Sequence, residues 1–429
     1  MSLGDVTSVL RKGIFDIKAD TYVEAGEGVP FVRISDLKHG IIDENSTACI
    51  SEEAHLKEIA TALEFGDIAI SKTAYPSAAL ITIPACNVSQ DIIATKFSSV
   101  GKQRIIPQYA LLFLLSRFGI EIMGAEFQGN VQEHLSLSDA KKLPIPALSR
   151  EFQQRTKAVF QSALTLTQRS KAHLNEAEVQ LASSVGLGDW SPPEPLTYTA
   201  SASTARAAIR LDAQYFMPAK EQVRRSLAAL PGKLLIDRVD SIRDQWLPEA
   251  ADPGTLVRNY DVTDALVPIL DAEKEPSAAE DIGSMKKVLR DGDVAVSRLR
   301  AYLKEIAVVR TADDIPSVGS SEFIVLRPEN DRISPETLMV FLRSIPVQTI
   351  LKWCQDGSQH PRFSESDLLS IPVPDAVVDA SAKITSLVLK GFAARRQAAA
   401  LLDAAKRAVE VAIEQDELTA LRFLDAAEA

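Results

Sequence analysis

Polar side chains that can pair with nucleic-acid bases lie in a stretch that the chain contains twice. The stretch spans 129–146 and again 357–374, 228 residues later and without a gap, and six of its eighteen positions are identical. The identical pairs are Gly129/Gly357, Ser136/Ser364, Ser138/Ser366, Asp139/Asp367, Pro144/Pro372 and Pro146/Pro374. Chance rarely produces such a match, so it indicates an internal repeat that decides the fold prediction.

The donors and acceptors beside these shared positions differ between the two copies. The first copy has Gln128, Asn130, Gln132 and His134, and the second has Asp356, Ser358, Gln359, His360 and Arg362. Asn, Gln and Arg side chains pair bidentately with base edges. A loop that keeps its frame while its donors change would suit two readers of different base sequences. The alternative is that each of these side chains is a solvated loop residue without function.

A second matched stretch places basic side chains after a strand. The runs 63–72 and 289–298 share a Gly-Asp turn followed by apolar residues, 226 positions apart. Lys72 and Thr73 follow the first strand, and Arg298 and Arg300 follow the second. Such side chains could position phosphates. As isolated surface charges they would have no function.

The repeat extends over nearly the whole chain and predicts two domains of one α+β kind. In each copy, a Gly-opened loop leads to a helical turn that Ser136 or Ser364 caps, with an Asp three residues on, and an X-Pro-X-Pro exit stops the helix. The opening Leu3 has an echo in Leu235. Patterns of apolar residues predict strands at 29–35, 67–71, 80–83, 91–97, 294–297, 305–309 and 322–326, and helices at 107–117, up to 230, and at 335–353.

Two long segments have the character of helical rods. Residues 149–184 contain neither Gly nor Pro, and residues 380–415 repeat Leu and Ala along one face. A helix of this length spans about 54 Å at ~1.5 Å per residue, too long for the core of a small domain. The two helices are therefore expected to pair with each other as a coiled coil, with close approach at the Ala positions of the second.

Composition places limits on the class of protein. With 46% apolar and 24% charged residues the chain is an ordinary globular protein, and no stretch approaches the ~20 apolar residues of a membrane span. We therefore expect a cytoplasmic protein without a membrane partner. Three distant cysteines and five scattered histidines predict neither disulfides nor a metal site. The net charge of −11 argues mildly against nucleic acid as a partner.

Signatures of catalysis and of cofactor binding are absent from the sequence. It has no GxxxxGK[ST] loop, no GxGxxG after a strand and no GxSxG turn. Asp67 and Asp293 open strands after Gly, where carboxylates usually bind the local backbone. We therefore expect a chain without catalytic activity and without a cofactor.

These motifs, in this order, resemble the specificity (S) subunit of type I restriction-modification systems. The resemblance rests on the Leu-Gly-Asp opening at Leu3, the Gly-Asp strands at Gly66 and Gly292, the repeated Gly-to-Pro-x-Pro motif and the long helix after each copy. A run Arg-Leu-Asp-Ala-Gln-Tyr-Phe from Arg210 also looks like the lead-in that these proteins place before a recognition domain. The first half lacks a counterpart of this lead-in.

The resemblance implies two target recognition domains, at 1–148 and 210–374, each reading one half of a bipartite site in double-stranded DNA. It implies a spacer helix at 149–184, a linker at 185–209, and a second spacer helix with a tail at 375–429. The antiparallel helices would set the gap and bind modification (methyltransferase) subunits and, through them, the restriction subunit. Candidates for this contact are Arg155, Arg169, Arg395 and Arg396. Alternatives are a two-headed protein scaffold that does not bind DNA, an unrecognised enzyme, or a similar subunit of a related phage-defence methyltransferase system.

Overall fold

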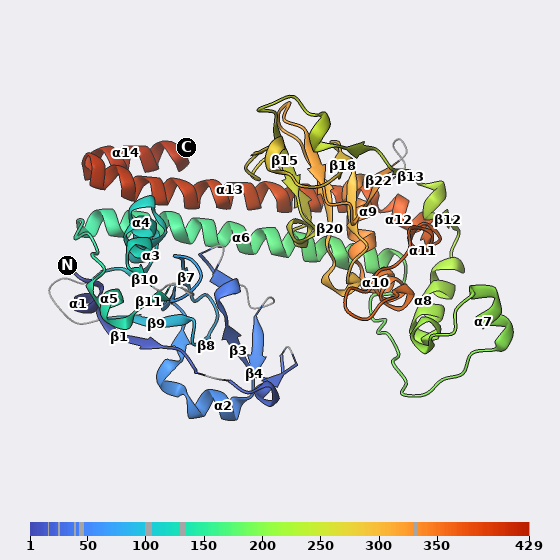
Figure 1. Ribbon diagram of the computed structural model, residues 1–429, viewed down its shortest axis with the longest axis horizontal. Helices are drawn as coiled ribbons and strands as arrows, with labels where there is room; N and C mark the ends of the chain where they lie inside the picture. Colours follow the sequence, from blue (N-terminus) through green and yellow to red (C-terminus); the bar gives the residue numbers. More distant parts are fainter. Residues whose placement is uncertain are drawn as a thin grey trace. The chain divides into compact units, whose positions relative to one another are not determined.

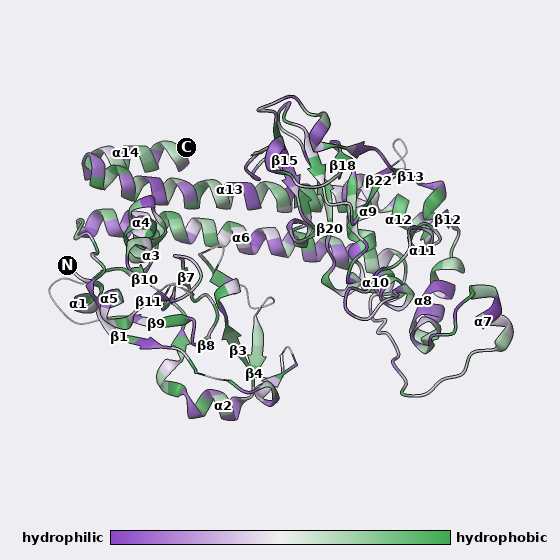
Figure 2. Ribbon diagram, in the orientation of Figure 1, coloured by the Kyte–Doolittle hydropathy of each residue, from purple (hydrophilic) through white to green (hydrophobic). Residues whose placement is uncertain are grey.

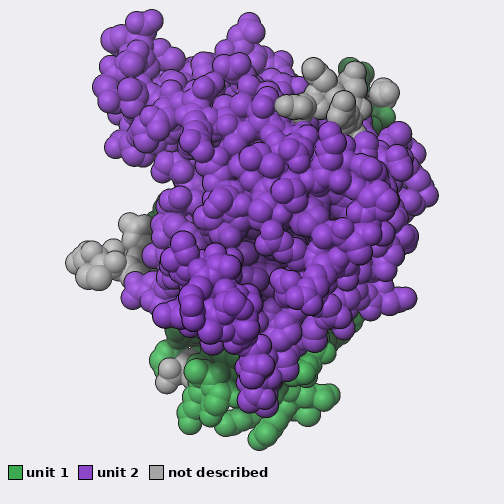
Figure 3. All heavy atoms as spheres, turned by 90° about the vertical axis from the view of Figure 1, so that its right-hand side faces the viewer, with its two compact units in different colours: residues 1–167, 395–429 green, residues 168–394 purple. Residues whose placement is uncertain are grey.

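The computed structural model (Figure 1) divides into two compact units (Figure 3). Unit 1 comprises residues 1–167 and 395–429, and unit 2 comprises residues 168–394. The structure describes residues 1–15, 17–24, 26–37, 40–42, 47–98, 105–128, 134–328 and 333–428. Each unit takes one part of both long helices, so the predicted boundaries of recognition domains and spacers stay a prediction.

Unit 1 contains two sheets. The first has the strand order β1-β9-β6-β7 and is antiparallel throughout; the second has the order β2-β4-β3-β8-β5, with β3 parallel to β8. The strands are β1 (Thr7–Lys12), β2 (Tyr22–Val23), β3 (Val29–Val32), β4 (Ala48–Ile50), β5 (Leu63–Glu64), β6 (Ile68–Ser71), β7 (Ala78–Leu80), β8 (Ala85–Val88) and β9 (Ile92–Phe97), with a further pair β10 (Phe127–Gln128) and β11 (His134–Leu135).

Unit 2 repeats this topology. Its first sheet has the order β13-β22-β19-β20-β16, and its second has the order β14-β18-β21-β15-β17, with β15 parallel to β21. The strands are β12 (Gly232–Leu234), β13 (Val239–Ile242), β14 (Gln245–Trp246), β15 (Leu256–Tyr260), β16 (Ile269–Leu270), β17 (Ser277–Ala278), β18 (Lys286–Leu289), β19 (Val294–Ser297), β20 (Ile306–Val309), β21 (Ser317–Gly319), β22 (Phe323–Pro328) and β23 (Pro372–Pro374). The series β13-β22-β19-β20 therefore matches β1-β9-β6-β7, and the predicted α+β repeat is confirmed.

Two predicted strands have different bounds in the structure. The strand predicted at 29–35 ends at Val32, because the N–H of Arg33 donates to the Asp36 carboxylate at 2.8 Å and a 3₁₀ turn, Ile34–Leu37, follows. The strand predicted at 80–83 lies at Ala78–Leu80 instead. The other predicted strands agree with the structure to within one or two residues.

Each copy contains a pair of consecutive helices where the sequence predicted one. The helices are α3 (Pro107–Leu115) and α4 (Arg117–Ala125) in unit 1, and α9 (Pro335–Arg343) and α10 (Ile345–Cys354) in unit 2. The prediction of one continuous helix at 335–353 is therefore wrong. Ser344 has an extended backbone (φ −64°, ψ 150°), and Pro346 cannot continue a preceding helix because it lacks an N–H.

The repeated motif folds as predicted in both copies. The helical turns α5 (Leu137–Lys142) and α11 (Glu365–Leu369) are capped by Ser136 and Ser364, whose hydroxyls accept the N–H of Asp139 and Asp367 at 3.1 and 3.0 Å. The chain then passes its Pro-x-Pro exit beside the opening residues of its own copy. The N–H of Leu3 donates to Leu143 at 2.7 Å and that of Leu235 to Ile371 at 2.9 Å.

The two rods predicted from the sequence are α6 (Arg150–Ser184) and α13 (Ser381–Glu414). In unit 2 they run antiparallel: Gly391 of α13 lies so close to α6 that an added Cβ would be 3.3 Å from the Ser170 carbonyl oxygen, and Lys383 donates to Gln180. In unit 1 one core contains Phe152 and Val159 of α6 together with residues of α13, among them Ala405, Ala408 and Ala412. Figure 2 shows hydrophobic and hydrophilic residues alternating along both helices, as expected for paired rods.

The remaining helices are shorter than α6 and α13. They are α1 (Leu3–Val6), α2 (Glu52–Lys57), α7 (Ala202–Ala208), α8 (Pro218–Ala228), α12 (Asp375–Asp379) and α14 (Glu417–Glu428). Helix α14 was not predicted as a separate element; its Ala420 and Leu424 are buried in the core of unit 1. Asp416 caps this helix, because its carboxylate accepts the N–H of Thr419 at 2.8 Å.

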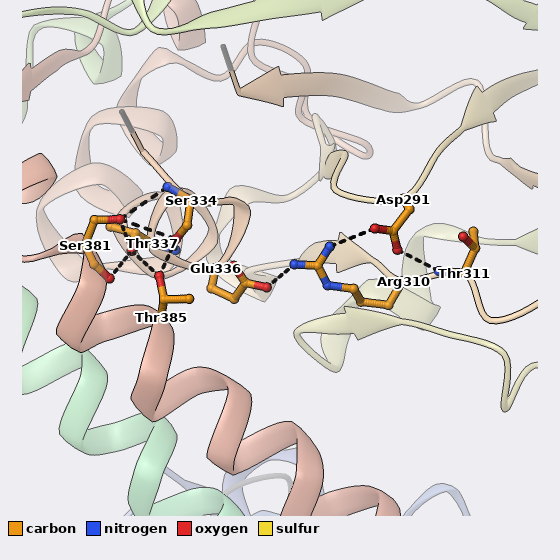
Figure 4. A network of polar contacts seen from close by, with 8 residues as sticks. All are labelled: Asp291, Arg310, Thr311, Ser334, Glu336, Thr337, Ser381 and Thr385. Atoms are coloured by element: carbon orange, nitrogen blue, oxygen red, sulfur yellow. Dashed lines mark hydrogen bonds and ion pairs between the residues drawn. The ribbon is translucent and has the colours of Figure 1, made fainter. Parts of the chain in front are cut away.

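Polar contacts fix the beginning of α13 to the body of unit 2 (Figure 4). The hydroxyl of Ser334 lies 2.6 Å from that of Thr385, and the N–H of Ser334 donates to Ser381 at 3.2 Å. Ser334 also caps α9 by accepting the N–H of Thr337 at 3.0 Å. Helix α9, which covers the sheet, therefore shares one hydrogen-bond network with the start of α13.

The three cysteines are free and buried. Burial raises the pKa of both Cys86 and Cys354 to about 12, so neither thiol ionises at neutral pH. In the part of the chain that the structure describes, no group of His, Cys, Asp or Glu is arranged to hold a metal ion. Nor is any described helix both long enough and apolar enough to cross a membrane.

Candidate nucleic-acid interface

The structure joins the two predicted binding segments in the same way in both copies. In unit 1 the N–H of Leu135, in the repeated motif, donates to the carbonyl of Lys72 at 2.8 Å. In unit 2 the N–H of Phe363 donates to the carbonyl of Arg298 at 3.2 Å. The basic residue that follows the Gly-Asp strand is thus bonded through its backbone to the end of the variable loop, twice.

Buried strands hold these basic residues in place. Every residue of β6 and β19 is buried, and Lys72 and Arg298 are the first residues after them. Two positions later, Ala74 and Arg300 have positive φ angles of 66° and 43°. A left-handed backbone is costly for residues other than glycine, and such strain gathers at functional sites. The chain therefore makes the same unusual turn at both candidate sites.

Glu322 joins two of the predicted residues in unit 2. Its carboxylate accepts from Arg298 Nε at 2.8 Å and from Arg362 Nη2 at 2.7 Å and Nε at 3.1 Å. Arg362 Nη1 donates to the His360 carbonyl at 3.0 Å, so Arg362 is held from both sides. The two Nη groups of Arg298 have no partner among the described residues, and its side chain is 45% exposed. Arg298 therefore has the freer guanidinium group of the two arginines.

The arginines also control the ionisation of this carboxylate. Hydrogen bonds from Arg362, and less from Arg298, lower the pKa of Glu322 to about 2 from an ordinary value of 4.5, against the effect of burial. Since the folded pKa lies below the unfolded one, the ion pairs stabilise the fold fully above about pH 4.5 and cease to do so as the pH falls toward 2.

The low pKa of Glu322 predicts how the stability of a variant without this charge depends on pH. The difference in unfolding free energy between wild type and Glu322→Gln should be constant above about pH 5 and should shrink below it, because protonation removes the same charge. Denaturant titrations at a series of pH values measure this difference. A difference that stays constant down to pH 3 would contradict the ion pairs.

The remaining candidates of the second copy lie around the same loop. Arg300 Nη2 is 3.1 Å from His360 Nδ1, and the Arg300 N–H donates to the Pro361 carbonyl at 3.0 Å. Asp356 and Arg362 exchange two backbone hydrogen bonds at 2.8 and 2.9 Å, which close the loop, and Gln359 is exposed within it. The structure thus brings together Arg298, Arg300, Gln359, His360 and Arg362.

The first copy gathers a matching but smaller set. Thr73 pairs with His134 in an antiparallel bridge, and His134 in turn pairs with Gln128 through the β10–β11 ladder. Lys72 is adjacent, half-buried, and burial lowers the pKa of its ammonium group. Asn130 and Gln132 lie outside the described residues.

The lead-in from Arg210 supports the loop of the second copy. Arg210 forms a bidentate ion pair with Asp212 at 2.6 and 2.8 Å, and its Nη2 donates to the Gln355 carbonyl at 3.3 Å. Gln355 Nε2 then donates to the Pro361 carbonyl at 3.0 Å. The motif therefore contacts the residue at which the loop begins. The sequence pattern indicated the motif but not its contact with the loop.

The four helix arginines differ in their surroundings. Arg155 forms ion pairs with Asp425, at 2.8 Å, and Glu428, so it holds α14 against α6. Arg169 and Arg396 are exposed, and Arg395 is half-buried. Arg155 is thus already committed within its own unit, whereas Arg169 and Arg396 have exposed side chains. All four stay candidates for partner contacts.

Comparison with known proteins gives matches among solved structures only. No protein-family model matches the chain, and no curated protein does. The S subunit of a type I restriction-modification system from M. genitalium matches 99% of this chain and 95% of its own, with 11% identity and a TM-score of 0.41. The HsdS subunit of Thermoanaerobacter tengcongensis matches 100% and 95%, with 16% identity and a TM-score of 0.29. A chain from a structural study of assembly and conformational transition in the type I R-M system matches 100% and 96%, with 16% identity and a TM-score of 0.31.

Proposed function

We propose that this chain is the DNA-specificity subunit of a type I restriction-modification complex. The observation that carries the proposal is the repeated site: one backbone frame, built twice, presents Lys72 and His134 in one copy and Arg298, Arg362 and His360 in the other. Keeping the frame while changing the donors is what reading two different half-sites requires. In this proposal each copy reads one half of a bipartite target in double-stranded DNA.

The helices α6 and α13 have two roles in the proposal. They set the number of unread base pairs between the half-sites, and their exposed arginines, Arg169 and Arg396, bind modification subunits. Partner subunits would then supply part of the positive surface that DNA binding needs, which accommodates the net charge of −11. Methyl transfer belongs to those partners, and this chain contributes recognition alone.

The test is selection of bound sequences from a random duplex library by the full chain, together with its modification subunits. Wild type should select two short segments separated by unread bases. Arg298→Ala should relax the preference at one or two positions of one half-site, by about 1 to 3 kcal/mol if a bidentate base contact is lost, and leave the other half-site intact. Gln359→Ala should act on the same half-site.

Lys72→Ala is the matched control, because Lys72 occupies the same place in the first copy and should affect only the opposite half-site. Equal weakening of all sequences by Arg298→Ala would assign that residue to phosphate contacts. A wild-type chain that selects no sequence, and whose affinity for duplexes does not depend on salt, would favour the protein-binding scaffold instead.

A further inference from the structure

The carboxylate of Glu322 restrains two arginines without covering them. Arg298 and Arg362 are 45% and 41% exposed, whereas Glu322 between them is only 23% exposed. Its two oxygens share the donors, since Oε2 accepts from Arg298 and Oε1 from Arg362. Exposed arginines ordinarily move among many rotamers, and fixing them costs conformational entropy on binding. Because Glu322 already holds both arginines in the free protein, less of this entropy is lost when DNA binds.

The first copy has an acidic residue at the corresponding place. The Arg298 N–H donates to the Glu322 carbonyl at 3.1 Å, and the Lys72 N–H donates to the Asp91 carbonyl at 2.7 Å. Glu322 and Asp91 directly precede β22 and β9, which pair with β19 and β6, the strands that end just before the basic residues. An acidic residue beside the basic residue of the site therefore occurs in both copies and is part of the repeated unit.

The acid also sets the local charge. Two arginines with one carboxylate have a net charge of +1, whereas two arginines alone would have +2. A phosphate attracts guanidinium groups regardless of the base sequence, and each extra cation strengthens that nonspecific attraction. A guanine edge differs because it accepts two parallel hydrogen bonds from one guanidinium. Arg298 can offer such a pair, because its Nη groups have no partner among the described residues while its Nε is held by Glu322.

We propose that Glu322 is a specificity-determining residue of the second recognition domain: it orients Arg298 toward base edges, with Arg362 held beside it, and weakens the capture of both arginines by phosphate alone. Asp91 has the corresponding place beside Lys72 in the first domain. The inference rests on the proposed function, because it assumes that this surface reads DNA. It predicts that removing an acid makes binding to random DNA tighter and recognition poorer.

The experiment compares Glu322→Gln with wild type in the full chain and its modification subunits. Gln keeps the size of the side chain and removes its charge. Affinity for a random duplex should rise, with a plot of log affinity against log salt steeper by up to about one unit. Discrimination at the second half-site should fall roughly five- to tenfold, within the range of a single bidentate contact. The first half-site should not change.

Two controls separate the mechanism from general effects of charge and stability. Glu221→Gln removes the same charge from an exposed helical pair with Arg225 and should change neither quantity. Asp91→Asn should reduce discrimination at the first half-site only. Glu322→Gln binding that weakens equally for target and random DNA, with an unchanged salt slope, would overturn the inference and leave Glu322 a structural residue. A wild type without any preferred sequence would instead overturn the proposed function.

Discussion

Inserting four residues into both α6 and α13 is expected to lengthen the unread gap of the proposed target by one or two base pairs and leave both half-sites unchanged. The insertions belong after Thr167 and after Ala394, where the two units divide. Both helices are continuous across these points. Binding of the wild-type target should fall almost completely, because a site with the original gap no longer meets both recognition domains.

The geometry of helix and duplex lets this insertion change the gap while the orientation of each recognition domain on its half-site stays nearly the same. Four residues add about 6 Å and turn a helix by about 40° beyond a full circle. Two base pairs add about 7 Å and turn DNA by about 70°. The remaining mismatch of about 30° is small enough for DNA twist to absorb.

An insertion in only one helix is the informative control. It puts the pairing of α6 with α13 on one side of the insertion out of register with the pairing on the other side, such as that of Gly391 with Ser170, and should therefore lower stability and yield no new target. Selection from a random duplex library with wild type, both single insertions and the double insertion measures the outcome. An unchanged gap in the double insertion, or altered half-sites, would show that the helices do not set the spacing.

The elements that sequence predicted best are those fixed by local pattern. The repeated motif, its serine caps and the two long helices depend on residues within a few positions of one another. Pro346 is a signal for the break at Ser344, but the apolar pattern on both sides of it favoured one continuous helix. Helix α14 was missed because its charged residues, among them Asp425 and Glu428, become part of the fold only through Arg155 of a distant helix.

The part of the candidate site that escaped prediction depends on strand register. Glu322 lies 24 residues from Arg298 and 40 from Arg362. The pairing of β19 with β22 brings Glu322 beside Arg298, and the bridge between Leu299 and Arg362 adds the third residue. In the sequence, Arg298 and Arg362 belong to separate motifs, and nothing in either motif indicates that the two side chains share a partner. The repeat did contain a usable signal, since an acid precedes the corresponding strand in both copies, at Asp91 and Glu322. Aligning the two halves residue by residue would have identified it.

The buried ion pair at the beginning of β19 predicts the largest effect on stability. Asp293 is fully buried and forms a bidentate pair with Arg327 at 2.8 and 2.9 Å, while also accepting the N–H of Arg290 at 2.8 Å. Its counterpart Asp67 accepts the Glu64 N–H at 2.8 Å but lies 3.4 Å from Lys96. Burial raises the pKa of Asp67 in spite of Lys96, so its ionised form is less well compensated.

Asp293→Asn should therefore destabilise unit 2 by about 3 kcal/mol, because it removes the partner of a guanidinium that stays partly buried. The matched change Asp67→Asn keeps the acceptor for the Glu64 N–H and gives up a weaker ion pair, so we expect a loss of about 1 kcal/mol or less. Native-state hydrogen exchange of amides in β19 and β22, compared with β6 and β9, measures the two units separately. Equal losses in the two variants would contradict this account. Because Arg298 directly follows β19, the same loosening should reach the second recognition surface first, and Asp293→Asn should blur the second half-site at temperatures where the first is still read normally.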